Sequence, residues 1–352
     1  HEKLSHADIR EGLSFLGLFG IMDSPREEAR EAIAACLKGG IDVKMITGDH
    51  VLTASSIGAL LGIPGSNQVM TGADIERLSA EALAQSVQDI DIYARMNPEH
   101  KLKLVRALQT HDAVVAMTGD GVNDAPALKA ADIGIAMGKQ GTEVAKEASD
   151  LVLVDDNFAS IVHAVEEGRN IYRNIRCTIQ FMLVTDCAEG LILLIAILAG
   201  FTLPITPLQI LWVNMVTAVT LSLAFAFAPR DPSVMHHPPL SPNSPLFSRL
   251  EVGAMLWHVL LIAAGTISLF LYEMNNFDDT KAARTIAVNV MVFFQIYYLW
   301  AMFPLQNKLS AMMPVILATS GVLFFQLGFT YIPWMQIIFA TAFVLFLLDA
   351  AL

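Results

Sequence analysis

Three polar residues in the first half of the chain have side chains suited to phosphate chemistry, and each stands at or just after the end of a short apolar run or its turn. Thr47 offers a hydroxyl, Lys101 a fixed positive charge and Asp120 a carboxylate that can bind a metal ion. Transfer of a phosphoryl group depends mainly on neutralising the charge of its oxygens. If the fold brings these three residues together, they form a site for phosphoryl transfer.

The segment from Met117 to Lys129 is the most informative stretch of the chain. It reads Met-Thr-Gly-Asp-Gly-Val-Asn-Asp-Ala-Pro-Ala-Leu-Lys, so two glycines flank Asp120, and Asn123 and Asp124 follow. Glycines let the backbone turn sharply and approach a ligand closely. Carboxylates at the carboxyl end of a strand are placed where an open α/β sheet would hold Mg²⁺ and a phosphate. The alternative is an acidic surface turn, because Asp-Gly and Asn-Asp are common turn formers.

The other two signals are weak when taken singly. Thr47-Gly48-Asp49 could be an ordinary turn, and the sequence Asn-Pro-Glu-His before Lys101 could be a simple helix start with a solvated lysine. Their order on successive strand ends, ahead of Asp120, favours one shared site over three unrelated turns.

The first half of the chain alternates apolar runs with amphipathic stretches, and glycine-rich or polar turns follow the runs. This order predicts a doubly wound α/β domain. We expect strands at 13–20, 41–46, 92–95, 113–117, 133–137 and 151–154, with helices at 25–38, after 49 to 61, and up to 108. The unbroken β-branched run 113–117 suggests a strand that is buried on both faces.

Composition divides the chain into two unlike halves. The hydrophobic fraction is 54% and the formal net charge is −12, with most charges before about residue 170. The absence of a Lys/Arg cluster in the sequence argues against nucleic acid as a partner. Three cysteines without paired or metal-ligand spacing fit a reduced, cytoplasm-facing protein. Because the sequence begins at His1, we expect a piece of a longer protein.

The second half contains six apolar stretches of about the length that a bilayer requires. They run over 178–201, 207–228, 252–272, 285–303, 312–330 and 333–352. Basic residues precede the first stretch and join the second to the third, whereas Asp278 and Asp279 lie between the third and fourth. The positive-inside rule therefore predicts that the first half of the chain is cytoplasmic.

Two carboxylates interrupt the first apolar stretch. Asp186 and Glu189 are three residues apart, so they share one helix face, and Asn214 and Thr217 repeat this spacing with neutral oxygens on the next stretch. Ionisable side chains inside a membrane are costly and usually mark an ion path. The alternative is that both carboxylates only pair with polar groups to hold helices together.

These motifs together resemble those of P-type ATPases, whose phosphorylation domain belongs to the haloacid-dehalogenase superfamily. Residues 13 to about 230 look like the end of that domain, followed by the fifth and sixth membrane helices of a P2-type, calcium-pump-like cation pump. The resemblance implies that Asp120 binds Mg²⁺, that Lys101 contacts the phosphate, and that ATP is the substrate. It assigns further roles in or beside the catalytic site to Thr47, Gly48, Asp49, Asn123 and Asp124, with support from Asp23 and Arg26, which match the family's Asp-Pro-Pro-Arg.

The resemblance also implies a binding site for a transported cation. Glu189, Asn214 and Thr217 match the residues of calcium pumps, and Gln295 aligns with a glutamate of some of them. Asp186 stands where those pumps have Asn, and Ala218 stands where they have Asp. The changes keep a cation pump as the interpretation, with Ca²⁺ favoured and a Na⁺, K⁺ or H⁺ pump as the alternative.

Parts of the family pattern are missing from this sequence. It has no Asp-Lys-Thr-Gly-Thr with the phosphorylated aspartate and no Thr-Gly-Glu-Ser loop. The resemblance therefore implies a C-terminal fragment, inactive alone, whose partner is an N-terminal part with the actuator domain, the nucleotide domain and helices 1–4. We expect residues 1–172 to belong to the phosphorylation domain and residues 173–352 to six helices in a lipid bilayer, equivalent to helices 5–10 of the family.

Two other classes of protein stay open, and so does the exact location. A membrane-anchored phosphatase of the same superfamily would have spans without an ion site, and a passive scaffold would need no upstream nucleophile. We expect an integral membrane protein of the plasma membrane. We also expect a helix from 158 to 176, and the resemblance implies that it continues into the first apolar stretch and so connects the two halves.

Overall fold

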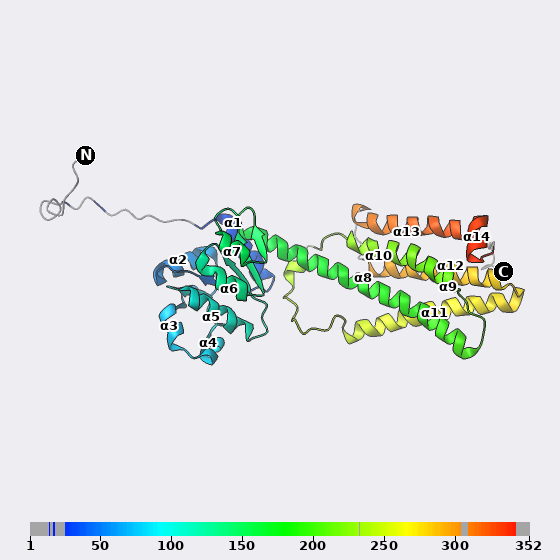
Figure 1. Cartoon of the computed structure of the whole chain (residues 1–352), viewed down its shortest axis with the longest axis horizontal. Coiled ribbons are helices and arrows are strands. Elements are labelled where there is room, and N and C mark those ends of the chain that lie inside the picture. Colours follow the sequence, from blue (N-terminus) through cyan, green and yellow to red (C-terminus); the bar gives the residue numbers. More distant parts are fainter. Residues whose placement is uncertain (1–13, 15–16, 18–24, 232, 304–308, 343–352) are drawn as a thin grey trace. The chain divides into compact units, whose positions relative to one another are not determined.

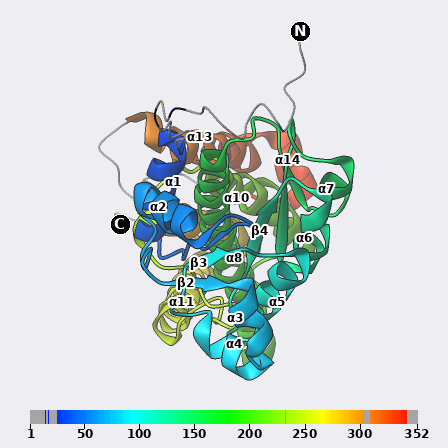
Figure 2. The same ribbon diagram turned by 90° about the vertical axis from the view of Figure 1, so that its left-hand side faces the viewer.

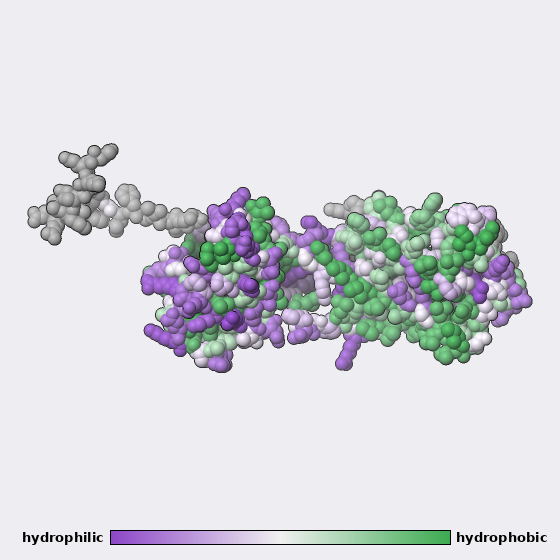
Figure 3. Space-filling model, viewed as in Figure 1, coloured by the Kyte–Doolittle hydropathy of each residue, from purple (hydrophilic) through white to green (hydrophobic). Residues whose placement is uncertain are grey.

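The computed structural model describes residues 14, 17, 25–231, 233–303 and 309–342, and the chain divides into two compact units, His1–Val162 and His163–Leu352 (Figure 1). Hydrophilic side chains dominate the visible surface of the first unit, whereas hydrophobic side chains dominate that of the second (Figure 3). The strand expected at 13–20, as well as Asp23, lies outside the described residues apart from positions 14 and 17.

The first unit contains a three-stranded parallel sheet with the order β1-β3-β2. Strand β3 is wholly buried, and Figure 2 shows it beside β2. The strands are β1 (Met45–Ile46), β2 (Val69–Thr71) and β3 (Ile92–Ala94), and the helices around them are α1 (Glu27–Lys38), α2 (Val51–Leu61), α3 (Gly72–Arg77), α4 (Ala80–Ser86) and α5 (Pro98–Gln109).

Local sequence fixes where helix α5 begins. The Asn97 side chain accepts a hydrogen bond from the His100 N–H at 2.9 Å, and the His100 ring accepts one from the Asn97 N–H at 3.3 Å. Pro98 occupies the first helical position, where the missing N–H costs nothing. This capping box places Lys101 in the first turn of α5, directly after the carboxyl end of β3.

A second parallel sheet follows, with the order β4-β5-β6. Its strands are β4 (Ala116–Gly119), β5 (Ile133–Met137) and β6 (Leu151–Leu153), and its helical segments are η1 (Val122–Asp124), α6 (Ala125–Ala130) and α7 (Glu143–Glu147). Because all three strands are parallel, the turns that follow them, including that of Asp120, lie at one edge of the sheet.

The structure corrects two of the expected strands. The strand expected at 113–117 begins only at Ala116, and its buried character is wrong because Val114 is 63% exposed and Ala116 is also exposed. The strand expected at 41–46 contains only Met45 and Ile46. The described residues thus form two three-stranded parallel sheets flanked by helices, so a single doubly wound sheet is not confirmed.

The second unit is helical. Helix α8 (Phe158–Ala199) is continuous over 42 residues, so the expected extension of the helix at 158–176 into the first apolar stretch is confirmed. The other elements are α9 (Pro207–Val213), a π-helical turn η2 (Asn214–Ala218), α10 (Val219–Ala226), η3 (Val234–His236), α11 (Arg249–Phe277), α12 (Thr280–Met302), α13 (Leu309–Tyr331) and α14 (Pro333–Phe339).

Five helical segments among the described residues are long and apolar enough to cross a membrane. They are α8, the run Pro207–Ala226, α11, α12 and the Ala311–Tyr331 part of α13. The sixth expected span begins with the short helix α14, and its residues 343–352 lie outside the described part of the chain.

Close packing holds the membrane-type helices together. Phe181, Ile192, Leu221 and Phe329 are almost completely buried in one hydrophobic cluster. Helices α11 and α12 approach closely at Gly265, where a Cβ atom would lie 2.6 Å from the Phe294 ring. Small residues at such crossings are typical of membrane helices, whose association depends on van der Waals contact.

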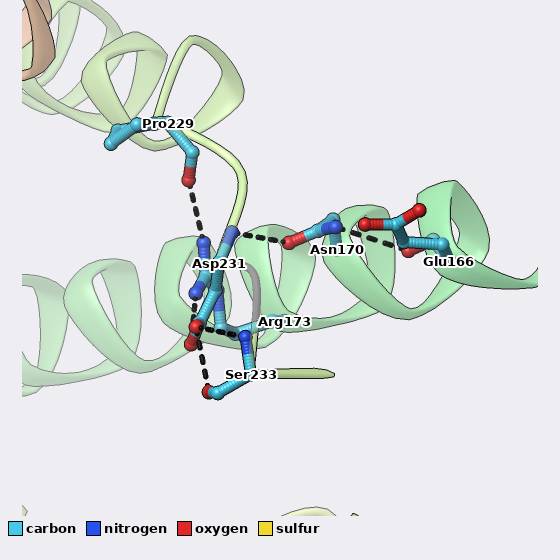
Figure 4. Close-up of polar contacts among 6 residues, drawn as sticks. All are labelled: Glu166, Asn170, Arg173, Pro229, Asp231 and Ser233. Atoms are coloured by element: carbon cyan, nitrogen blue, oxygen red, sulfur yellow. Dashed lines mark hydrogen bonds and ion pairs between the residues drawn. The ribbon is translucent and has the colours of Figure 1, made fainter. Parts of the chain in front are cut away.

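Polar contacts bind the connector after α10 to helix α8 (Figure 4). The Arg173 guanidinium donates to the Asp231 carboxylate at 2.8 Å and to the Pro229 carbonyl at 2.9 Å. The Asn170 side chain accepts from the Asp231 N–H at 3.0 Å. Hydrogen bonds from Ser233, together with Arg173, lower the pKa of Asp231. The Asp231 carboxylate is therefore ionised at neutral pH and keeps the connector attached to α8.

Gly134→Ala tests the packing of β5, the central strand beside Asp120's strand. A Cβ atom there would lie 2.6 Å from the Leu128 carbonyl oxygen, and this backbone cannot easily yield. We expect a loss of about 1–3 kcal/mol of local stability. Hydrogen exchange of the Ile133–Met137 amides measures it. Gly168→Ala, which meets nothing within 4 Å, is the control, and equal exchange in both variants would contradict the packing argument.

Candidate functional site

A hollow of about 390 Å³ in the first unit brings together several of the residues singled out from the sequence. Lys101, Asp120 and Asp124 contribute to its lining, and Arg26 does so from the residue before α1. Asp120 and Asp124 follow the carboxyl end of β4, and Lys101 lies in the first turn of α5, the helix that follows β3. The hollow therefore lies where open α/β sheets bind phosphate ligands.

Lys101 and Asp124 form an ion pair in this hollow. The Lys101 ammonium donates to the Asp124 Oδ1 atom at 2.5 Å, and the two side chains are only 19% and 8% exposed. Gly119 permits this arrangement, because a Cβ atom at that position would lie 2.6 Å from the Asp124 Cβ atom. The pair keeps the positive charge of Lys101 at the hollow. The partner of the ammonium group is the Asp124 carboxylate and not solvent.

Asp120 is exposed, and its carboxylate has no hydrogen-bond or ion-pair partner among the described residues. Its backbone is held, since its carbonyl accepts from the Thr142 N–H at 2.8 Å. Mg²⁺ is usually bound by one or two carboxylates together with waters and substrate phosphates. A fixed backbone with a free carboxylate at a phosphate-sized hollow fits such an ion.

The Thr47-Gly48-Asp49 turn and Asn123 do not contribute to the lining of the hollow. The Thr47 hydroxyl donates to the Asp49 carboxylate at 3.0 Å and accepts from the Asp49 N–H at 3.1 Å. A Cβ atom on Gly48 would meet nothing within 4 Å. The neighbouring Ile46 does line the hollow, so the turn follows a lining residue directly.

Among the lining residues that sequence reasoning missed, three are polar and lie outside the Met117–Lys129 segment: Gln140, Asp156 and Asn157. Asp156 also contacts a residue that the sequence did select, because its carbonyl accepts from the Arg26 guanidinium at 3.2 Å. The only signal was the Asp155-Asp156-Asn157 triplet just before α8, a composition that is also typical of ordinary turns.

In the second unit, the candidate cation ligands gather around Glu189 of α8. Glu189 is only 5% exposed, and its Oε1 atom accepts a hydrogen bond from the Gln295 amide of α12 at 3.3 Å. The Asn214 side chain also interacts with this carboxylate. Three elements therefore contribute polar atoms to one buried place.

Two buried oxygens beside Glu189 lack a donor. The Asn214 Oδ1 and Gln295 Oε1 atoms have no hydrogen-bond partner in the described part of the protein. Buried acceptors are almost always satisfied, so each exception requires an explanation. Both belong to amides that hydrogen-bond the Glu189 carboxylate, and oxygens of these three side chains are the kind of ligand that a hard cation binds. The donor set thus fits a hard cation.

The π-helical turn contributes to this arrangement. Asn214 and Thr217 both lie in η2, and such turns frequently occur at functional sites. The Thr217 hydroxyl donates to the Val213 carbonyl at 2.6 Å, so its oxygen keeps an accepting lone pair. Asp186 differs from the others because it is exposed, one turn before Glu189 on the same helix.

Comparison with known protein families matches both units. Residues 202–347 match the family described as cation transporting ATPase, C-terminus. Residues 2–132 and 100–165 match two families of haloacid dehalogenase-like hydrolases. The chain therefore combines a haloacid-dehalogenase-like domain with a helical region that contains five candidate membrane spans.

Individual relatives point to the same class. The chain is 41% identical to "Cation-transporting ATPase pma1" of Synechocystis sp., with 97% of the chain and 39% of that protein aligned. It is 44% identical to "Probable cation-transporting ATPase F" of Mycobacterium tuberculosis, over 94% of the chain and 38% of that protein. It is 45% identical to "Calcium-transporting ATPase" of Bacillus subtilis, over 85% of the chain and 34% of that protein.

By these matches the chain is similar to P-type cation-transporting ATPases and to haloacid dehalogenase-like hydrolases. The apolar helices and the relatives also support an integral membrane protein. The chain spans about 39% of the length of the Synechocystis relative that it matches.

Lys101→Met tests the ion pair directly. The substitution strands the Asp124 carboxylate in a largely buried position, so we expect a loss of roughly 2 kcal/mol of local stability, less than for a fully buried pair. Lys101→Met combined with Asp124→Asn removes the stranded charge and should recover at least half of that loss. The stability of both variants is measured by urea titration, with the hydrogen-exchange protection of the Ala116–Gly119 amides as the readout. A double variant that is no more stable than the single one would contradict the pairing.

Proposed function

We propose that the chain is the C-terminal part of an ATP-driven pump that moves a cation across a membrane through an aspartyl-phosphate intermediate. The observation that carries this proposal is the presence of two sites in one polypeptide. One is a hollow with Lys101 and a free Asp120 carboxylate, and the other is a buried Glu189 beside two unsatisfied amide oxygens. A phosphatase would need only the first site.

In the proposed reaction, the residues of the hollow bind and orient the phosphate groups. Lys101, held by Asp124, supplies a positive charge to the phosphoryl oxygens, and Asp120 holds Mg²⁺, which neutralises further charge when bound. Thr47, Gly48 and Asp49 contribute hydroxyl and backbone donors from the end of β1, and Asn123 completes the turn. The phosphorylated aspartate comes from the N-terminal part of the longer polypeptide, together with the nucleotide and actuator domains and helices 1–4. Because the sequence lacks this aspartate, we expect the fragment to be inactive alone.

The transported ion is held by Glu189, Asn214, Thr217 and Gln295, with Asp186 near the same level of α8. We favour Ca²⁺ because three of these residues match calcium pumps and relatives carry that name, as in Bacillus subtilis. Ala218 lacks the oxygen expected for Ca²⁺, so a pump for Na⁺, K⁺ or H⁺ is the alternative. Ca²⁺ usually takes six to eight oxygens, so the missing part of the polypeptide would supply the rest.

The proposed arrangement in the cell follows from the charges outside the spans. The phosphorylation domain, which we place at 1–172, faces the cytoplasm, and residues 173–352 cross the plasma membrane with six helices. Helix α8 is continuous and carries Glu189, so a change at its first turn can reach the ion site within one element. Such a pump alternates between two global states that bind the ion differently.

Asp120→Asn in the full-length protein tests the phosphoryl-transfer site. The variant keeps the shape of the side chain but loses the charge that binds Mg²⁺, so phosphoenzyme formation from ATP should fall at least about a hundredfold. Exposure of Asp120 makes the folded state insensitive to this change. Labelling with radioactive ATP measures phosphoenzyme, and exchange of the β4 amides checks the fold. Wild-type labelling would rule out the assigned role.

Glu189→Gln tests the ion site, with Asp186→Asn as a comparison. Because Glu189 is buried and Asp186 is exposed, we expect the apparent affinity for the activating ion to fall at least about tenfold for Glu189→Gln and less for Asp186→Asn. ATP hydrolysis by the reconstituted full-length protein is titrated with Ca²⁺, Na⁺, K⁺, Mn²⁺ and protons. Hydrolysis that depends on none of these ions would favour a membrane-anchored phosphatase.

A further inference from the structure

The turn between β6 and α8 contains a residue with an unusual backbone. Asp156 has a φ angle of 53°, in the left-handed region that side chains other than glycine, asparagine and aspartate rarely adopt. Its backbone N–H donates to the Leu153 carbonyl at 3.2 Å, which closes the turn after β6. This conformation directs the carboxylate toward the segment that follows the neighbouring strand β5.

The Asp156 carboxylate accepts hydrogen bonds from three consecutive backbone amides. Oδ1 accepts from Gly138 at 2.7 Å and from Lys139 at 2.9 Å, and Oδ2 accepts from Gln140 at 2.9 Å. Successive N–H groups that point at one anion form a strong binding concavity. The bond from the Lys139 amide, with those from Gln140 and Gly138, lowers the pKa of Asp156, so the carboxylate is ionised at neutral pH.

The segment that Asp156 binds can adopt this shape only with its glycines. A Cβ atom on Gly138 would lie 2.7 Å from the Leu153 carbonyl oxygen, and one on Gly141 would overlap the Met137 carbonyl. The segment then reaches Thr142, whose N–H donates to the Asp120 carbonyl at 2.8 Å. A short chain of hydrogen bonds therefore runs from Asp156 through residues 138–142 to the backbone of Asp120.

The same turn is bound to the start of α8. The Asp155 carboxylate accepts from the Ser160 hydroxyl at 2.6 Å, and the Asn157 side chain accepts from the Ala159 N–H at 2.9 Å. Asp156 itself stands two residues before Phe158, the first residue of α8. Its carbonyl also accepts from Arg26, so α1 limits the movement of this turn.

We propose that Asp156 is a positioning residue that ties the first turn of α8 to the backbone of Asp120. It does not touch the phosphoryl group. It holds segment 138–142 in place, and that segment holds Asp120 so that the carboxylate faces the hollow. This inference rests on the proposed function for the role of Asp120, whereas the hydrogen bonds to Gly138, Lys139 and Gln140 do not depend on it. A displacement of the first turn of α8 would therefore shift the backbone of Asp120, and a displacement of Asp120 would shift that turn.

The test compares Asp156→Ala and Asp156→Asn with Asp155→Asn in the full-length protein. Asp155→Asn is the matched control because the Asp155 carboxylate accepts from Ser160 of α8 and feels the charge of Lys139, but it accepts no described hydrogen bond from the amides of residues 138–140. Hydrogen exchange of the 138–140 amides should speed up at least about tenfold in Asp156→Ala, less in Asp156→Asn, and little in the control. This measurement needs no catalytic activity.

The second measurement is the Mg²⁺ concentration that gives half-maximal protection of the Thr118–Asp124 amides. We expect it to rise about tenfold in Asp156→Ala and to stay at the wild-type value in Asp155→Asn. A purely structural role would speed exchange at 138–140 without changing this concentration, and that outcome would overturn the proposal. Unchanged exchange at 138–140 would overturn it as well.

The outcomes also separate this inference from the proposed function. If Mg²⁺ protects no amides near Asp120 in the wild-type protein, the Mg²⁺ role of Asp120 fails, whatever Asp156 does. If Mg²⁺ protects them equally in every variant, only the role of Asp156 fails. If Asp156→Ala unfolds β5, as judged by exchange at Ile133–Met137, the isosteric Asp156→Asn variant decides.

Discussion

The Lys101–Asp124 ion pair joins the two sheets of the first unit at their carboxyl edges. Lys101 begins the helix after β3 of the first sheet, and Asp124 follows β4 of the second. A largely buried charge without its partner would be strongly destabilising, so the two edges are held together by the cost of separating them. The pair lines the hollow together with residues from both sheets, and Gly119 leaves the room that the pair requires.

Glu189, the buried carboxylate of the second unit, has different surroundings from those of Asp124. Glu189 is buried among helices with one hydrogen bond from Gln295 and a neighbouring Asn214, and no arginine or lysine pairs with it among the described residues. Both amides donate to the carboxylate, while the Asn214 Oδ1 and Gln295 Oε1 atoms accept no hydrogen bond among the described residues. In the proposed pump the transported cation would complete this site, whereas the hollow of the first unit carries its own positive charge in Lys101.

Residue types predicted which side chains meet at the hollow better than periodicity predicted the limits of the strands. Lys101, Asp120 and Asp124 could be selected because few side chains suit phosphate chemistry and glycines mark the turns around them. The limits of the strands expected at 41–46 and 113–117 could not be predicted, because a β-branched run does not reveal where pairing with a neighbouring strand begins. Val114, for example, is apolar yet exposed. The continuity of helix α8 was predictable only from the resemblance to P-type ATPases, not from the periodicity of the sequence. Asp156 was not, because its role depends on a positive φ angle and on amides 16 to 18 residues earlier in the chain.

The π-helical turn at Asn214–Ala218 also affects how this span tolerates changes in length. A π turn contains one residue more than the α turn that it replaces, and the α-helix resumes at Val219 with Leu221, Ala224 and Phe225 buried. Losing one residue inside the turn would restore an ordinary helix and leave the buried face of α10 almost unrotated. The same loss within α11 or α12 would turn every later side chain by about 100°. Compared with α11 and α12, the span that carries Asn214 and Thr217 can therefore lose a residue with less disturbance of the side chains that follow.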